Sequence, residues 1–396
     1  MQSVPPPDGA AWLIGEMGSA PAAIEHRSAR GACQGEAPKC LEERVKAAGW
    51  NGQPEPSRSG EHRPWLADLI WLGSEERHVH TLKATAQTVH IAHFSSELKP
   101  VLTIEDGDTV VLESLRGDPA EYEAAGIPPR EIPQPLRDLY RELQSYRGHE
   151  LTGPIYVKGA EPGDVLEVHI QEIRLTMPFG FNANVYGAGT LPEDFPYTSW
   201  RVIRMDLEKM VSEVIPGVVI PLQPFFGVMG VAPPARLGKI SSGPPGVHGG
   251  NIDLKELGPG SILSLPVHAR GALFSAGDGH AVQGDGEVCY TAIETSMTGT
   301  FQFRVQKGVR LKWPRAETPT HIITMGFHED LDLAAKMALR EMIDYLGQER
   351  GIKPEQAYML SSLAVDLRIT QLVNTVKGVH AILPKSLFAA QSPGSA

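Results

Sequence analysis

Acidic and histidine side chains are concentrated in two glycine-rich segments near the middle of the chain, residues 246–253 (GVHGGNID) and 275–287 (SAGDGHAVQGDGE). Imidazoles and carboxylates bind metal ions and transfer protons in enzymes. Glycine permits turns that other residues resist and lets a backbone approach a ligand closely. Asp-Gly and Gly-Asp pairs are also common in plain hairpin turns. Two segments that each combine a histidine with carboxylates nevertheless favour a functional site.

The first hypothesis for these residues is a divalent metal site. A mixed set of imidazoles and carboxylates with one open position is typical of catalytic zinc, whereas an oxygen-rich set would favour calcium or magnesium. The chain has no compact ligand motif such as HExxH, so the ligands would have to converge from separate segments. The alternative is that the two histidines only brace their loops through hydrogen bonds. The predicted ligands are His248, Asp253, Asp278, His280 and Glu294.

The same segments contain groups that could transfer protons and hold a small polar substrate. We expect His280 at the reacting centre and Asp285 or Glu287 as the general base. Side-chain amides and glycine backbone amides can match the C=O and NH₂ groups of a substrate amide. The predicted substrate-binding residues are Gly249, Gly250, Asn251 and Gln283.

A covalent mechanism is the alternative to attack by water. Cys289 lies in EVCYTAIE, which we expect to be a strand, and a buried, unreactive thiol is the usual state of a cysteine there. Ser241 and Ser242 precede the first glycine-rich segment, but the GxSxG motif of a nucleophilic serine is absent from the sequence.

Composition and charge argue against several kinds of binding partner and of cellular location. The 396 residues carry a net charge of -11 without a cluster of Lys and Arg, which argues against nucleic acid as a partner. The sequence has no long apolar run that predicts a membrane span, and MQSVPPPDGAAWL lacks the parts of a secretory signal. The three cysteines, Cys33, Cys40 and Cys289, have no framework spacing, which suits free thiols in a reducing cytoplasm.

We divide the chain into an N-terminal extension (1–63), one large domain (64–388) and a C-terminal tail (389–396). The extension is rich in Pro, Gly, Ala, Ser and Glu, and this composition favours mobility for much of it. Its tryptophans leave open the alternative that it docks on a neighbouring subunit.

Short alternating segments bounded by Gly and Pro predict many strands, and residues 329–350 and 354–364 predict helices. The Asp-Gly turn at 105–108 predicts a β-hairpin. Together these patterns indicate a β-rich α+β fold, with a β-sandwich or barrel core and a helical segment near the C-terminus.

Two segments interrupt the predicted strands. Residues 119–149 contain a helical pattern from Gln134 to Tyr146, which is either a surface helix or a lid over a site. Residues 178–197 lack a regular pattern, and we expect a loop whose Phe179, Phe181 and Tyr186 could line an apolar pocket.

Three long stretches, HGGNID, GALFSAGDGHAVQGDGEVCYTAIE and LTGPIYVKGAEPGDVLEVHI, resemble the acetamidase/formamidase family of amide hydrolases. The resemblance covers roughly Thr81 to Phe388. It implies the β-rich fold, a homo-oligomer (a dimer or higher) and cleavage of the C–N bond of a short, linear, non-peptide amide to a carboxylate and ammonia or an amine. A metal-activated water is the expected nucleophile. A related ester, carbamate or larger amide is one alternative, and a non-catalytic binding protein on the same scaffold is another.

Overall fold

The computed structural model describes residues 78–143 and 148–388. The chain divides into two units between Gly73 and Ser74, and all described residues belong to the second unit. The predicted extension (1–63), with Cys33 and Cys40, and the predicted tail (389–396) lie outside the described residues. The described residues are rich in strands, with 40% strand and 18% helix, which confirms the predicted β-rich α+β class.

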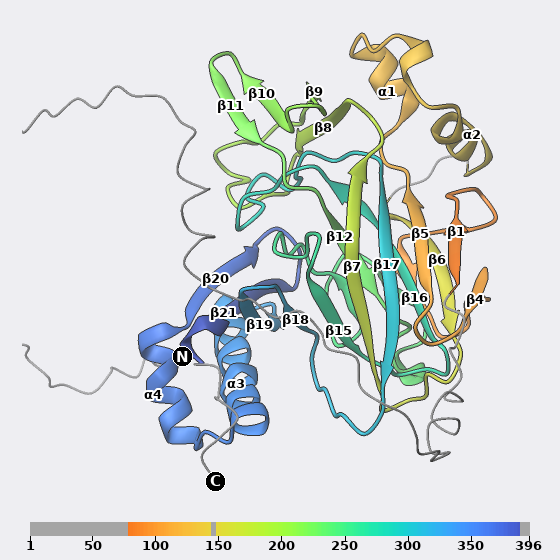
Figure 1. The fold of residues 1–396 in the computed structure, drawn as a ribbon. Coiled ribbons are helices and arrows are strands. Elements are labelled where there is room, and N and C mark those ends of the chain that lie inside the picture. Colours follow the sequence, from red (N-terminus) through yellow and green to blue (C-terminus); the bar gives the residue numbers. More distant parts are fainter. Residues whose placement is uncertain (1–77, 144–147, 389–396) are drawn as a thin grey trace, which may run out of the picture. The chain divides into compact units, whose positions relative to one another are not determined.

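The larger sheet has nine strands, of which β5 and most of β17 alternate between buried and partly exposed residues as an amphipathic strand should, whereas the interiors of β19 and β21 are buried throughout. Figure 1 shows its two longest strands, β7 and β17, side by side. In their order across the sheet the strands are β1 (Val79–Leu82), β5 (Thr109–Ser114), β17 (Met297–Gln306), β7 (Val165–Leu175), β15 (Ile262–Pro266), β18 (Arg315–Glu317), β19 (His321–His328), β21 (Lys377–Pro384) and β20 (Asp366–Gln371).

The second sheet packs against part of the first and carries the glycine-rich segments. Aromatic rings join the two sheets, with Phe226 5.2 Å from Phe301 and Phe274 5.1 Å from Phe303 between ring centroids. Its strands are β14 (Gly249–Asn251), β12 (Phe225–Gly230), β16 (Ala272–His280), β6 (Glu150–Val157) and β2 (Val89–Ile91), with β4 (Leu102–Ile104) also paired to β6. Every residue of β16 is buried, so polar groups on this strand need partners inside the protein.

The hairpin predicted at residues 105–108 is wrong. The turn is present, but β4 before it pairs with β6 in the second sheet, whereas β5 after it pairs with β1 and β17 in the first. The turn at 161–164 does the same, because β6 and β7 belong to different sheets. A turn signal reports where the chain reverses, and it carries no information about which strand each arm will pair with.

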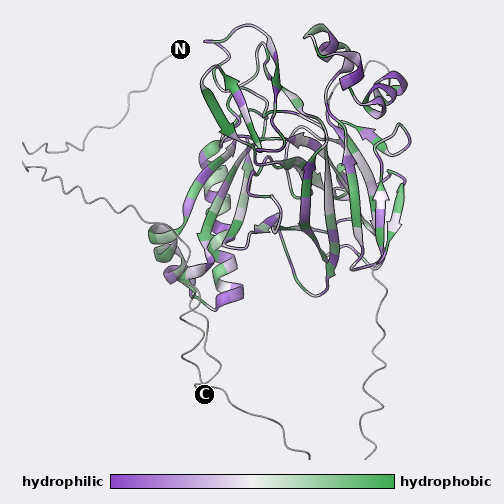
Figure 2. Cartoon of the chain, turned by 45° about the horizontal axis from the view of Figure 1, so that its top comes forward, coloured by the Kyte–Doolittle hydropathy of each residue, from purple (hydrophilic) through white to green (hydrophobic). Residues whose placement is uncertain are grey.

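Two helices near the C-terminus confirm the prediction for residues 329–364. In α3 (Leu331–Arg350) the Asp330 carboxylate accepts a hydrogen bond from Leu333 N, and Gly351 ends the helix with φ 64°. This helix buries an apolar stripe against β19 and β21, and α4 (Pro354–Ala364) packs on α3; the mixed colours of these helices in Figure 2 show their two-faced character. Within the described residues no helix is long and apolar enough to cross a membrane.

The segment before β6 folds into two helices, α1 (Pro119–Ala124) and α2 (Gln134–Leu143), so the helix predicted from Gln134 is confirmed as far as Leu143. Leu136 and Leu139 are fully buried in a satellite core with Tyr122 and Phe179. Three short 3-10 helices complete the helical elements of the described residues. They are η1 (Pro129–Glu131), η2 (Ala235–Leu237) and η3 (Lys385–Leu387).

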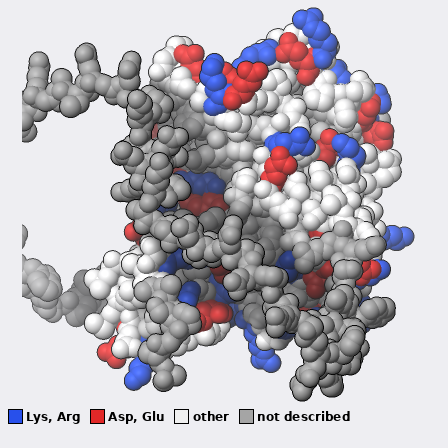
Figure 3. All heavy atoms as spheres, in the orientation of Figure 1, with Lys and Arg blue, Asp and Glu red and all other residues white. Residues whose placement is uncertain are grey.

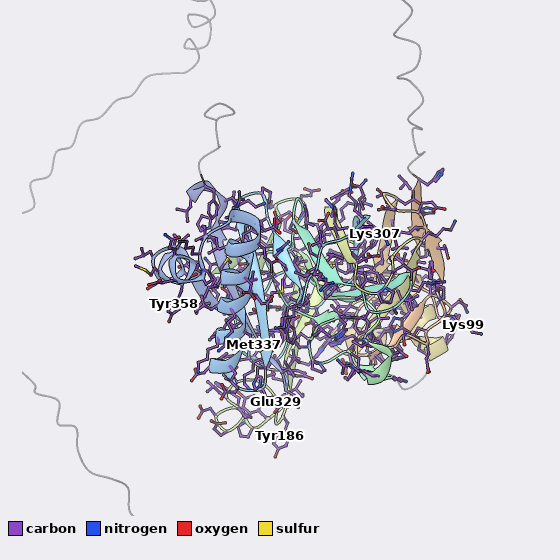
Figure 4. The ribbon with its side chains drawn as sticks, turned by 90° about the horizontal axis from the view of Figure 1, so that it is seen from below. Lys99, Tyr186, Lys307, Glu329, Met337 and Tyr358 are labelled. Carbon is purple, nitrogen blue, oxygen red and sulfur yellow. The ribbon has the colours of Figure 1, made fainter. Side chains whose placement is uncertain are left out.

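Residues 178–197 are more regular than predicted, because they contain a strand that starts at Phe179. Phe179 is buried in the satellite core and Phe181 stacks on Trp200 at 5.4 Å, whereas Tyr186 is 70% exposed and points outward in Figure 4. The remaining paired strands are β8 (Phe179–Asn184) with β9 (Ser199–Arg204), β10 (Val211–Ile215) with β11 (Val218–Pro221), and β3 (His93–Phe94) with β13 (Ile240–Ser241). On the uncovered part of the face in Figure 3, acidic and basic side chains lie interspersed.

Candidate active site

The end of β16 carries the centre of the candidate site. Asp278 and His280 lie in this strand, not in a loop as the glycine pattern suggested. The neighbouring strand β12 has Gly227 opposite Asp278, and a Cβ atom there would lie 2.7 Å from His280 Cε1, 2.8 Å from Asp253 Oδ1 and 2.9 Å from Asp278 Oδ2. Only glycine therefore leaves room for these side chains to converge.

Gln283 fixes the orientation of the His280 ring. The Gln283 side-chain NH₂ donates to the backbone carbonyl of Asp253 at 2.9 Å, so its Oε1 faces His280 Nδ1 at 3.0 Å. A carbonyl oxygen can only accept, so Nδ1 carries the proton, and in the neutral ring Nε2 has the lone pair. That lone pair is the one available to a metal ion.

Two carboxylates converge on His280 Nε2. Asp278 Oδ2 and Glu294 Oε1 each lie 3.2 Å from this nitrogen, yet neither makes a well-aligned hydrogen bond with it. Their other oxygens face Arg116, whose Nη2 is 3.1 Å from Asp278 Oδ1 and whose Nε is 3.0 Å from Glu294 Oε2. The same guanidinium is 3.1 Å from Glu150 Oε2. We name Asp278, Glu294, Glu150 and Arg116 the Arg116 side of the centre.

The electrostatics of the Arg116 side favour an ionised Asp278. Burial opposes ionisation of Asp278, but the charges of His149, Arg116 and His280 outweigh it and hold its pKa well below the usual range. Burial opposes protonation of His280, but Glu294 and Asp278 raise its pKa well above the usual value. An environment that favours a proton on Nε2 favours a metal cation there for the same reason.

A second carboxylate pair lies toward Nδ1 of His280. Asp253 Oδ1 is 3.9 Å from Nδ1, and Asp253, His280 and Glu287 each place a ligand atom within 4.8 Å of the others. Burial raises the pKa of Asp253 to about 8 and, together with the charge of Asp253, raises that of Glu287 well above its usual range. We name Asp253 and Glu287 the carboxyl pair.

The backbone at these carboxylates is unusual. Asp253, Asp278 and Glu287 have φ values of 55°, 57° and 46°, in the left-handed region that non-glycine residues avoid. Such conformations persist only where the surrounding structure enforces them, and they cluster at functional sites. Three of them around one histidine support a functional role for this centre.

The residues present fit a divalent metal ion. His280 Nε2 and Asp253 Oδ1 are buried and lack a hydrogen-bond partner, and the nearest donor set on the Nε2 side is His280 with Asp278 and Glu294. One imidazole and two carboxylates, with room for a further ligand, is a set that zinc accepts. Buried Arg116 contacts hold the outer carboxylate oxygens, which is how outer-shell groups orient metal ligands.

His248, a predicted ligand, lies apart from these groups. It is buried, its ring is 5.0 Å from that of Phe94, and burial together with His268 lowers its pKa to about 4. In the described residues its side chain belongs to neither ligand group around His280. Glycines and Asn251 of the first segment form β14, where Asn251 donates to Gly243 O at 3.0 Å and keeps a buried Oδ1 without a partner.

Two other residues proposed from sequence occupy different positions from those expected. Asp285 pairs with Lys255 at 3.0 Å and lies in a separate group with Glu256 and His380, away from His280. Cys289 lies in a loop, not in a strand, and is half-buried, with Sγ 3.3 Å from Asn182 Nδ2. The strand prediction for EVCYTAIE is therefore wrong.

A cavity of about 340 Å³ connects several of these residues. Gln283, Asp285, Glu287 and Cys289 line it, together with apolar side chains, so Gln283 and Glu287 belong both to the cavity wall and to the surroundings of His280. The apolar lining residues are Ile203, Val214, Ile215, Ile220, Val282, Val288, Ala292 and Ile293. Its size is at the lower end of the range for ligand pockets.

Sequence reasoning missed Arg116, Glu150 and Tyr140. Arg116 follows β5, Glu150 begins β6, and Tyr140 of α2 donates its hydroxyl to Glu150 Oε1 at 2.6 Å. The inserted segment 119–149 thus contributes through Tyr140 to the Arg116 side. No motif in the sequence marks these residues, because their contacts with the centre arise only in the folded chain.

The model of the acetamidase/formamidase family matches residues 79–242 and 240–390. A relative from Schizosaccharomyces pombe is 28% identical over 259 residues, 52% of this chain but only 61% of that protein. The formamidase of Methylophilus methylotrophus is 28% identical over 324 residues, 63% of this chain and 79% of that enzyme. An acetamidase from Yersinia enterocolitica has a crystal structure with a TM-score of 0.69 and 31% identity, covering 80% of this chain and 95% of that one. The chain belongs to the acetamidase/formamidase family.

Proposed function

We propose that the protein is an amide hydrolase that cleaves the C–N bond of a linear, non-peptide amide to a carboxylate and ammonia or an amine. Family membership and the similarity to a formamidase and an acetamidase support this reaction class. The observation that carries the proposal is the arrangement of four buried carboxylates around one histidine, in which Asp278 is held ionised beside Arg116 while the carboxyl pair favours holding a proton. Amide hydrolysis needs both, because the carbonyl must be polarised and the leaving amine must be protonated.

In this proposal His280 Nε2, Asp278 and Glu294 hold the divalent ion, with zinc first and calcium or magnesium as alternatives. The ion would polarise the amide carbonyl and lower the pKa of water. Gln283 keeps the proton of His280 on Nδ1, and Arg116 orients Asp278 and Glu294 through their outer oxygens. His248 and Asp285, which the sequence suggested for the centre, have no role in this arrangement.

Glu287 is the proposed proton carrier. It lines the 340 Å³ cavity, lies beside Asp253, and has a raised pKa because of burial and that neighbour. A carboxyl group whose pKa is raised holds a proton that it can give to the leaving amine, and its carboxylate form can take a proton from water. Asp253 shares the proton with Glu287, since two adjacent buried carboxylates do not both ionise easily.

The cavity suggests a substrate larger than formamide as a second candidate. Formamide has three non-hydrogen atoms and would leave most of the 340 Å³ unfilled, whereas an apolar acyl or amine group could contact the aliphatic walls. The substrate's C=O and NH₂ would be held by polar groups such as Gln283. An ester or carbamate with the same acyl group remains a related alternative.

A serine mechanism is the competing interpretation, and one contact favours it. Ser242 Oγ lies 2.9 Å from His149 Nδ1, and His149 Nε2 is 3.8 Å from Asp278 Oδ2. These contacts connect a candidate nucleophile, a base and an orienting carboxylate in the order found in serine hydrolases. The last distance is too long for a hydrogen bond, and Ser242 is buried. Replacing Ser242 by alanine would abolish turnover in the serine mechanism and leave it largely intact in ours.

The first experiment combines elemental analysis of the purified protein with ammonia release from formamide, acetamide and longer acyl amides, before and after chelation. We expect a bound divalent metal and turnover that chelation removes and metal addition restores. Turnover by metal-free protein would reject the metal centre. Binding of amides without turnover of any of them would favour a non-catalytic binding protein.

We also propose a cytoplasmic location and a homo-oligomer. The absence of framework cysteine spacing in the sequence and the acidic net charge of -11 support the first, and the resemblance to the family supports the second. Fractionation of the cells and light scattering of the purified protein test these two points.

A further inference from the structure

A second group of ligand-type side chains lies outside the His280 centre. Glu256, Asp285 and His380 each place a ligand atom within 4.8 Å of the others. They come from three separate segments, since Glu256 follows β14, Asp285 lies in the loop after β16, and His380 belongs to β21. The amide hydrolase mechanism uses none of them.

His380 directs an unpaired nitrogen into this group. The side chain is fully buried, with its Nδ1 2.8 Å from the hydroxyl of Thr370 and its Nε2 without any hydrogen-bond partner. Glu256 Oε2 is likewise buried and unpaired, 3.9 Å from that Nε2. An unsatisfied buried pair of this kind costs free energy unless another group joins it.

Basic side chains near this group contact oxygens of its carboxylates. Arg368 Nη1 is 3.5 Å from Glu256 Oε1, and Lys255 Nζ is 3.0 Å from Asp285 Oδ1. Glu256 Oε2 and the second oxygen of Asp285 remain for another partner. As with Asp278 near His280, Glu256 has one oxygen near a basic side chain and its other oxygen toward an imidazole.

We propose that Glu256, Asp285 and His380 form a second site for a first-row divalent cation such as zinc. The 3.9 Å between His380 Nε2 and Glu256 Oε2 exceeds hydrogen-bond length but is close to the roughly 3.4 Å between two ligands of one tetrahedral zinc ion. One imidazole and two carboxylates form a donor set suited to such ions. This proposal does not depend on the reaction at His280.

A cation here would fix the two loops that carry the carboxyl pair. Glu256 is in the loop of Asp253, and Asp285 is in the loop of Glu287. Backbone hydrogen bonds already join Gly286 N to Thr370 O at 3.1 Å and Leu372 N to Gly286 O at 3.0 Å. The cation would add a side-chain link between β21 and both loops, which gives it a positioning role.

The test counts bound metal in full-length protein. Metal-free protein is saturated with Co²⁺, desalted and analysed for cobalt and for its visible absorption, which reports coordination by protein ligands. We expect His380→Gln to bind about one equivalent less per chain than the wild type. His280→Gln should lose a different equivalent, so that the double variant loses both. The matched control is His90→Gln, because His90 also has an unpaired ring nitrogen but belongs to neither carboxylate group.

Equal cobalt binding by His380→Gln and wild-type protein would overturn the proposal. If His380→Gln does not fold, Glu256→Gln replaces it, and a crystal of the wild-type protein soaked with Zn²⁺ gives a second measurement. An anomalous peak between His380 Nε2 and Glu256 Oε2 is expected, and its absence after soaking at a saturating Zn²⁺ concentration would reject the site. Cobalt binding and the anomalous peak both detect the metal directly, so a variant that has lost amide turnover can still be tested.

Discussion

Both sides of the His280 ring contain aspartate and glutamate, but these carboxylates differ in their electrostatic surroundings. On the Arg116 side, a guanidinium contacts Asp278, Glu294 and Glu150, and the pKa of Asp278 is held well below its usual range. The carboxyl pair, Asp253 and Glu287, has no arginine or lysine among the ion pairs of the described residues, and burial raises both pKa values. One side is therefore suited to hold a cation and the other to hold a proton.

This difference shows that the neighbours of a carboxylate, and not its residue type, determine whether it binds a metal ion or transfers protons. Aspartate and glutamate occur on both sides, so the sequence alone cannot say which carboxylate is a ligand and which transfers protons. A single arginine from the end of β5, distant in sequence from both glycine-rich segments, makes the division. The following predictions test that division, starting with the largest expected effect.

Replacing Arg116 by leucine should abolish the electrostatic difference between the Arg116 side and the carboxyl pair. Three buried carboxylates would lose a charged partner, and we expect the free energy of unfolding to fall by about 3 to 5 kcal/mol, measured by urea denaturation. The control is Arg137→Leu, which breaks the more exposed ion pair with Glu123 and should cost less than about 1 kcal/mol. Similar losses in the two variants would contradict the role assigned to Arg116.

Replacing Glu287 by glutamine should affect catalysis more than stability. The amide resembles the protonated carboxyl in shape, so the fold should persist, while kcat for amide hydrolysis should fall by about 10² to 10⁴. Cys289→Ser is the matched control on the same cavity wall, and we expect it to change kcat by less than about threefold, because the thiol takes no part in water attack. The opposite ranking of these two variants would move the nucleophile to Cys289.

The carboxyl pair should also impose a pH dependence on metal-free protein. Folded Asp253 keeps its proton up to about pH 8, whereas the unfolded chain releases it near its usual value of 3.8, so the unfolded state binds fewer protons in between. Stability therefore falls as the pH rises through this window, by about 1 to 3 kcal/mol. We expect Asp253→Asn to flatten the dependence, measured by urea denaturation at a series of pH values.

Asp108 serves as a control, because its contribution to stability should change with pH in the direction opposite to that of Asp253. Burial opposes its ionisation, but hydrogen bonds from His78 N, His80 and Glu105 N lower its pKa. Its contribution to stability is present above the unfolded pKa and is lost as the pH falls through the folded value. Asp108→Asn should therefore change the acid end of the profile and leave the window of Asp253 unchanged. A flat profile in wild-type protein would show that the carboxyl pair is not proton-holding.

A smaller effect is expected from Gly227→Ala, which inserts a methyl group between the two sides. The new Cβ would lie 2.7 to 2.9 Å from His280, Asp253 and Asp278, so we expect a loss of about 1 to 3 kcal/mol in stability and weaker metal binding. In Gly258→Ala nothing lies within 4 Å of the new Cβ, and both measurements should remain at wild-type values. Normal metal binding by Gly227→Ala would place the ion elsewhere.

The sequence predicted the β-rich class and the two glycine-rich segments because strand alternation and glycine content are local properties. It could not predict that Asp285 would leave the centre while Glu287, two residues later, would join it, since a change of backbone direction at φ 46° is invisible in composition. Arg116 and Tyr140 were missed for another reason. Arg116 follows a strand and Tyr140 lies on a helix, and both reach the site only through the tertiary packing of these elements, which no spacing in the sequence encodes.

At the turns of residues 105–108 and 161–164 the chain passes from one sheet to the other, and this also determines when the protein can fold during synthesis. β5 lies between β1 and β17, yet the ribosome makes β6, β12, β14 and β16 of the other sheet before β17. The nascent chain must therefore carry β1 and β5 with an unpaired edge until residues 297–306 emerge. Pairings between such distant segments form slowly and expose strand edges to aggregation. We expect this protein to depend on chaperones that shield its N-terminal strands until the last third of the chain is made.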